Sequence, residues 1–155
     1  MRKLLALGVL VALPACGGSS SSPSVTPTPA PTPTPVPTFT GTYSGNMLYN
    51  VAGLAEVVVP ARTTITQNGN TIDFSNLVLS PPGINPITYV LGSAVLNGNA
   101  FSGSTNYASS GCGRIDVTTT GRFAGNLMNM TAILVSSQPN VQGCARSEMR
   151  GELSR

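Results

Sequence analysis

The stretch ARSEMRGEL at residues 145–153 decides the fold, because its charges occupy every second position. Arg146, Glu148, Arg150 and Glu152 alternate with small or apolar residues. Successive side chains of a strand point to opposite faces, so this pattern indicates a strand with one face in water and the other buried. Antiparallel sheets commonly have two such faces. The stretch therefore predicts the last strand of an antiparallel sheet.

Other stretches with the same period of two precede this strand, and turn residues separate them. With the last strand included, the expected strands are residues 39–49, 57–67, 71–79, 87–96, 100–107, 114–123, 127–135 and 145–153. Asn and Gly tolerate positive φ, so they mark tight hairpin turns at residues 68–70, 97–99 and 125–126. The longer connections span residues 51–56, 80–86, 108–113 and 136–143. Eight strands are thus joined alternately by longer loops and short turns.

This alternation of connections carries geometric information. In an up-and-down meander it places all four long loops at one end, and the short turns with both termini at the other. The arrangement resembles lipocalin-like and avidin-like barrels, whose long-loop end is the mouth; Gly41-Thr42-Tyr43 stands where lipocalins carry Gly-x-Trp. We predict an all-β fold for residues 39–155, an eight-stranded antiparallel up-and-down barrel. An eight-stranded β-sandwich is the alternative.

The chain begins with a predicted export signal. Arg2 and Lys3 precede the apolar run LLALGVLVAL at residues 4–13. This run is too short to span the bilayer core, which needs about 20 residues, and it fits a signal peptide over residues 1–15. The Gly/Ser-rich and Thr-Pro-rich stretches that follow predict a disordered, extended linker, so that residues 16–38 hold the anchor and linker.

Leu13-Pro14-Ala15-Cys16 resembles the lipobox of bacterial lipoprotein precursors. The resemblance implies transfer of diacylglycerol to the Cys16 sulfur, cleavage before Cys16, and acylation of the new amine with a fatty acid such as palmitate. Such an anchor holds a protein stably on a membrane. Gly17, in place of Asp, implies the outer membrane, on its periplasmic face or at the cell surface. Ordinary secretion, with Cys16 a plain thiol, is the alternative.

Composition excludes several classes of function. Charged residues are 8% of the chain, and His is absent, so the usual general base and the commonest metal ligand are missing. The net charge of +3 falls to +1 without residues 1–15, and Lys is absent from the rest. We therefore predict no nucleic-acid partner, no enzyme activity, no cofactor and no metal site.

The two remaining cysteines, Cys112 and Cys144, should form a disulfide in an exported domain. In the predicted meander both lie at the long-loop end, so the topology permits the bond. A redox or metal pair is the alternative, but the chain has neither a C-x-x-C spacing nor a histidine.

The interior of the barrel decides between two functions. Alternation predicts that the following larger residues point inward: Tyr43, Ile65, Phe74, Tyr89, Leu91, Phe101, Tyr107, Val117, Ile133 and Met149. It predicts the same for small residues that could leave space for a ligand: Gly41, Gly45, Ala61, Ser93, Gly103, Ser147 and Gly151. Residues 127–135 carry apolar side chains on both faces.

Two hypotheses follow for a membrane-anchored, non-catalytic envelope lipoprotein. The first is a carrier of a small hydrophobic ligand, bound at Tyr43, Tyr89, Ser93, Tyr107 and Ser147. The alternative is a protein-interaction or inhibitor module with a filled barrel, using the loops at residues 80–86 and 136–143.

Overall fold

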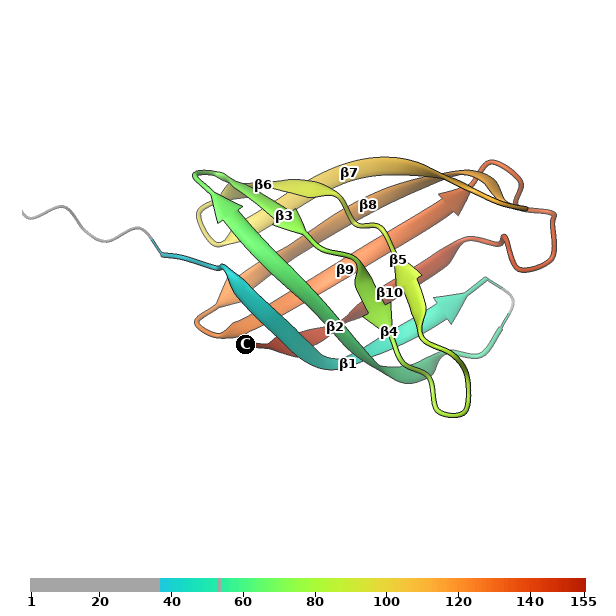
Figure 1. Ribbon diagram of the computed structural model, residues 1–155, viewed down its shortest axis with the longest axis horizontal. Coiled ribbons are helices and arrows are strands. Elements are labelled where there is room, and N and C mark those ends of the chain that lie inside the picture. Colours follow the sequence, from blue (N-terminus) through green and yellow to red (C-terminus); the bar gives the residue numbers. More distant parts are fainter. Residues whose placement is uncertain (1–36, 53) are drawn as a thin grey trace, which may run out of the picture. The chain divides into compact units, whose positions relative to one another are not determined.

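In the computed structural model, residues 37–52 and 54–155 are described, and they form a closed antiparallel barrel (Figure 1). The predicted signal peptide, Cys16 and the linker up to residue 36 lie outside the described residues. The strands are β1 Gly41–Val51, β2 Val57–Asn68, β3 Thr71–Phe74, β4 Leu77–Leu79, β5 Ile87–Tyr89, β6 Ser93–Asn97, β7 Ala100–Ser109, β8 Gly113–Ala124, β9 Leu127–Ser136 and β10 Ser147–Ser154.

The strands are ordered β1-β10-β9-β8-β7-β6-β3-β2, and pairing of β1 with β2 closes the ring. Every pairing is antiparallel; Ser44 lies opposite Ser154 on one side of β1 and opposite Arg62 on the other. Strand β4 continues β3 along β2, and β5 precedes β6, so two predicted strands are each divided into two short ones. The predicted eight-stranded up-and-down barrel is confirmed, and the β-sandwich alternative is wrong.

The interruption between β3 and β4 lies next to the interruption between β5 and β6. The Phe74 N–H donates to the Gly92 carbonyl oxygen at 3.0 Å, which joins the interruption at Ser75–Asn76 to that at Val90–Gly92. Gly92 has a φ of +71°, and such extra residues shift the alternation of faces by one. The prediction that Ser93 points inward is therefore wrong: Ser93 is exposed, and its neighbour Ala94 is buried.

The predicted inward orientation of Ile133 is also wrong. The buried residues of β9 are Met128, Met130, Ala132 and Leu134, and Ile133 lies opposite Glu148 on the outer face. Apolar residues occupy both faces of this strand, so its own alternation could not show which face is buried. The register with the neighbouring strands decides it, because Met128 lies opposite Phe123 and Leu153.

Aromatic side chains fill the barrel at the short-turn end. Phe39 stacks on Phe123 with ring centroids 4.1 Å apart, and Phe101 lies 5.1 Å from Phe123 and 5.5 Å from Phe74. Tyr43 is fully buried against them and donates its hydroxyl to the Phe39 carbonyl oxygen at 3.0 Å. Phe39, just before β1, thus closes this end of the interior.

Farther along, large and small side chains alternate around the wall. Phe101, Gly121, Met130, Gly151 and Met47 lie opposite one another in successive strands. A Cβ added at Gly121 would collide with the Phe101 ring, and one at Gly151 would lie 2.9 Å from the Met47 Cα. Small residues at these positions make room for neighbouring core side chains rather than for a ligand.

The last residue of the chain ties the two ends of the domain together. Arg155 donates through Nη1 to the carbonyl oxygens of Thr38 and Thr40, at 3.2 and 2.9 Å. Its Nη2 donates to Asn126 Oδ1 at 3.1 Å. These bonds hold the segment that leads into β1 against the turn between β8 and β9, at the short-turn end.

Candidate functional site at the long-loop end

The long loops gather at one end of the barrel, and the C-terminus lies at the other (Figure 1). Of the five predicted ligand residues, Tyr89, Tyr107 and Ser147 lie toward the long-loop end, where β5, β7 and β10 meet those loops. The remaining two lie apart. Tyr43 is part of the aromatic cluster at the opposite end, and Ser93 donates its hydroxyl to Asp73 on the outer surface. The five residues therefore do not form one site.

Three tyrosines form a cluster at the long-loop end of the interior. The hydroxyls of Tyr49 and Tyr89 are hydrogen-bonded at 2.7 Å, and their ring centroids are 6.1 Å apart. Tyr49, Tyr89 and Tyr107 are half-buried and pack against the core. Alternation in 39–49 placed Tyr49 in phase with Tyr43, but the pairing of its hydroxyl with Tyr89 depends on register across the barrel.

The hydroxyls of Tyr89 and Tyr107 stay protonated at neutral pH. Burial raises the pKa of Tyr89 above its ordinary value of 10.0, and the hydrogen bond with Tyr49 raises it further. Burial also raises the pKa of Tyr107. The cluster therefore offers neutral hydrogen-bonding groups and aromatic faces, a surface suited to uncharged groups rather than to ions.

The predicted disulfide between Cys112 and Cys144 is confirmed; the Cα atoms are 5.2 Å apart. It connects the loop after β7 to the loop before β10. Ser136 reinforces this junction, because its hydroxyl donates to the Cys112 carbonyl oxygen at 2.7 Å and accepts from the Gln138 N–H at 2.8 Å. The loop at residues 137–146 is thus held to the barrel at both of its ends.

The other feature of this end is a set of exposed aliphatic side chains. Leu54, Ile84 and Val141 come from three different long loops and are 69%, 66% and 44% exposed. Val57 and Val58, at the start of β2, are exposed as well. Apolar side chains gathered at one end of a domain are typical of a surface that contacts a partner.

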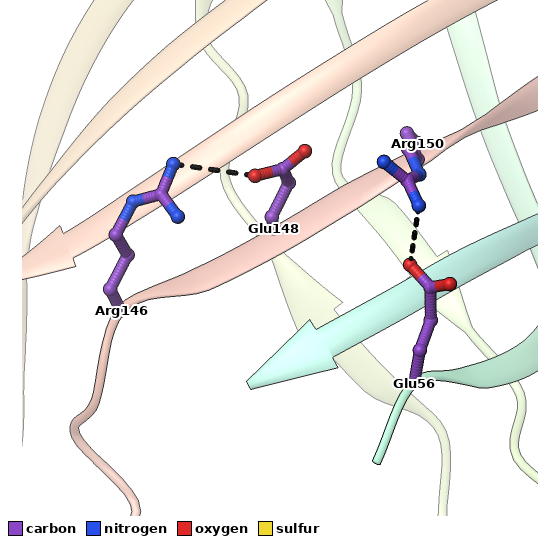
Figure 2. A network of polar contacts seen from close by, with 4 residues as sticks. All are labelled: Glu56, Arg146, Glu148 and Arg150. Carbon is purple, nitrogen blue, oxygen red and sulfur yellow. Dashed lines mark hydrogen bonds and ion pairs between the residues drawn. The ribbon is translucent and has the colours of Figure 1, made fainter. Parts of the chain in front are cut away.

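The charged residues of β10 lie on the outer wall of the barrel, as their alternation in the sequence predicted. Figure 2 shows Arg150 of β10 reaching Glu56 at 2.9 Å and Arg146 reaching Glu148 at 3.3 Å. A groove of about 480 Å³ crosses β8, β9, β10 and β1 on this outer wall, and its lining includes Leu48, Arg122, Met130, Arg150 and Glu152. Exposed ion pairs of this kind contribute about 0–1 kcal/mol each, so they shape the surface more than they stabilise the fold.

In residues 37–52 and 54–155, no three His, Cys, Asp or Glu side chains come together as a metal site would require. Within the same residues, no helix has the length and hydropathy to cross a membrane. Comparison with known proteins gave no match: no protein-family model, no curated protein and no solved structure aligns with the chain.

Proposed function

We propose that the chain is a membrane-anchored, non-catalytic lipoprotein of the cell envelope whose barrel domain binds a partner protein through its long-loop end. The observation that carries this proposal is the contrast between a filled interior and exposed apolar loops. Large side chains such as Tyr43, Met47 and Met149 are fully buried inside the barrel, whereas Leu54 and Ile84 are among its most exposed apolar residues. A filled barrel binds on its outer surface, and apolar loop residues supply contact area there.

The attachment proposed for the anchor agrees with this use of the loops. Lipidation of Cys16 would tether the domain to the outer membrane through the linker that precedes Pro37. Phe39 lies at the short-turn end, since it stacks on Phe123 of the closing aromatic cluster. The tether therefore joins the domain at the end opposite to the long loops and leaves those loops accessible.

Site-specific photo-crosslinking in the cells that make the protein tests this function. A photo-reactive residue at Ile84 or Val141 is expected to give one discrete crosslinked species, whereas the same residue at Val95 is expected to give none. Val95 is a matched control, because it is 62% exposed, like Ile84 at 66%, but lies on β6 away from the long loops. Equal crosslinking at Val95 and Ile84, or none at the loop positions, contradicts the proposal.

A second candidate function is carriage of a small hydrophobic ligand, and the tyrosine cluster favours it. Tyr49, Tyr89 and Tyr107 are half-buried, although they point into the barrel, so a small apolar group could rest on their rings. Native mass spectrometry of the exported protein, with Cys16→Ser to prevent lipidation, tests this. An adduct that is lost on denaturation supports carriage, and a clean protein mass contradicts it.

A further inference from the structure

We propose that the unpaired edge of β7, residues 106–109, binds an extended, uncharged segment of a partner polypeptide as an added β-strand. This inference rests on the proposed function, since it assigns a binding mode to the protein partner. A strand that lacks a neighbour presents free N–H and C=O groups, and an extended segment that adds to it gains main-chain hydrogen bonds.

The two sides of β7 are paired unequally. On one side β7 pairs with β8 over its full length, from Ala100–Arg122 to Ser109–Gly113. On the other side it pairs with β6 only from Ala100 to Ser102. Strand β5, which continues this neighbour toward the long loops, pairs with β4, and Figure 1 shows β5 beside β4 and away from β7. Among the described strands, none pairs with this side of β7 beyond Ser102.

The tight turn between β6 and β7 shows which backbone groups are free. Asn97 and Ala100 face each other across a two-residue turn, so they form the hydrogen-bonded pair that closes the hairpin. Alternate residues of a strand direct N–H and C=O toward the same neighbour. The groups of Asn106 and Ala108 therefore point to the unpaired side, while those of Thr105 and Tyr107 point to β8.

At the end of this edge that is nearer to the β6–β7 turn, the irregular segment before β6 lies against β7. A Cβ added at Gly103 would lie 2.8 Å from the Ala94 Cα, and one added at Gly92 would lie 2.7 Å from the Thr105 Cβ. The strands are thus in close contact up to Thr105 and separate beyond it. Because Gly92 and its neighbours interrupt the strand at that level, the same feature that reverses the face of Ser93 also leaves the edge of β7 unpaired.

The edge lacks the usual protection against pairing. Residues 106–109 are NYAS, without charge or proline, whereas natural edge strands are commonly blocked by Lys, Pro or a bulge. The tyrosine cluster lies beside the edge on its inner side, because Tyr107 belongs to β7 and Tyr89 to β5. The chemistry therefore fits an uncharged extended segment whose inward side chains are apolar or aromatic and rest on these rings.

Amide hydrogen exchange of the mature protein, followed by NMR, tests whether the edge is free. The amides of Asn106 and Ala108 are expected to exchange fast, and those of Thr105 and Tyr107 slowly. Uniform protection of residues 105–108 overturns the proposal. So does protection of Asn106 that disappears on deletion of residues 17–35, since the chain's own linker would then occupy the edge.

A binding experiment tests the added strand itself. The probe is a synthetic decapeptide that alternates Thr with Val and Tyr, and its control is N-methylated at alternate residues. Asn106→Pro removes one edge donor, and Asn106→Lys places a charge there; each is expected to weaken probe binding about tenfold or more. Ser102→Lys is the matched control, because Ser102 is exposed on the same face of β7 but lies where β6 is paired, and it is expected to bind as the parent does.

Equal probe binding by Asn106→Lys and Ser102→Lys, or by the N-methylated peptide, overturns strand addition. The proposed function is assessed separately through crosslinking at Ile84. If the Ile84 crosslink persists in the Asn106→Pro protein, the partner binds the loops without adding a strand, and only the present inference fails.

Discussion

Gly121 shows at the scale of one residue how side chains fill the interior of this barrel next to the aromatic cluster. Its missing side chain is replaced by the edge of the Phe101 ring, which lies against the Gly121 backbone. The backbone oxygen of Asn129 borders the same position. The glycine is therefore part of the core packing, and an added methyl group would have to displace both a ring and a backbone.

Gly121→Ala is expected to destabilise the domain by about 1–3 kcal/mol, because the new Cβ overpacks a filled core. Urea unfolding measures the change. Thr120→Ala, at the exposed neighbouring position on β8, is the control and is expected to shift the midpoint little. A Gly121→Ala protein as stable as its parent would mean that the interior has spare room.

The tyrosines give the fold a dependence on alkaline pH. Because burial raises the folded-state pKa of Tyr89 above 10.0, the unfolded chain ionises first as the pH increases. The stability is therefore fully present below pH 10 and decreases as the pH rises above it. Tyr89→Phe is expected to make the decrease between pH 10 and about 11 shallower, measured by denaturant unfolding at each pH. An unchanged slope would exclude Tyr89 as the group responsible.

At the scale of elements, the sequence predicted both the strand and its buried face where only one face was apolar. β10 follows its charges, and the turn at residues 97–99 was predicted from its Asn and Gly. The alternation of β9 could not identify its buried face, because both faces are apolar. The interruptions at Ser75–Asn76 and Val90–Gly92 also escaped prediction. Gly92 lies against Thr105, and a contact between residues so far apart in the sequence leaves no local pattern.

The candidate site was predictable to the same extent. Alternation predicted that Tyr89 and Tyr107 point inward, and both pack against the core of the barrel. Ser93 was misplaced because the interruption before it reverses its face. The unpaired edge of β7 has no signal in the sequence, since residues 106–109 alternate like those of any paired strand.

Comparing Gly92→Ala with Gly83→Ala separates two effects of a new Cβ: the strain of a positive φ and the collision with a neighbouring side chain. Both residues have positive φ, +71° and +73°, but an added Cβ meets Thr105 at position 92 and nothing within 4 Å at position 83. Gly83→Ala is expected to cost about 1 kcal/mol for the left-handed backbone alone. Gly92→Ala is expected to cost clearly more in the same thermal unfolding measurement. Equal losses would show that Thr105 can move aside.

At the scale of the whole molecule, the disulfide joins loops that belong to different hairpins. Cys112 and Cys144 are separated by 32 positions, so breaking the bond frees a long loop in the unfolded chain. The double variant Cys112→Ser, Cys144→Ser is expected to lose about 3–4 kcal/mol of stability. Denaturant unfolding of the parent with and without reductant provides the control, and a loss below about 1 kcal/mol would contradict the prediction.

Pairing of β1 with β10 has a consequence for the order of events after synthesis. The partner of β1 on that side, Ser147–Ser154, is synthesised after every other strand of the barrel, and Arg155 fastens the start of the domain. A nascent chain lacking these residues exposes one edge of β1 and one of β9. The ring therefore closes only after residues 147–155 have emerged from the ribosome, and until then the hairpins already made stay joined as an open sheet.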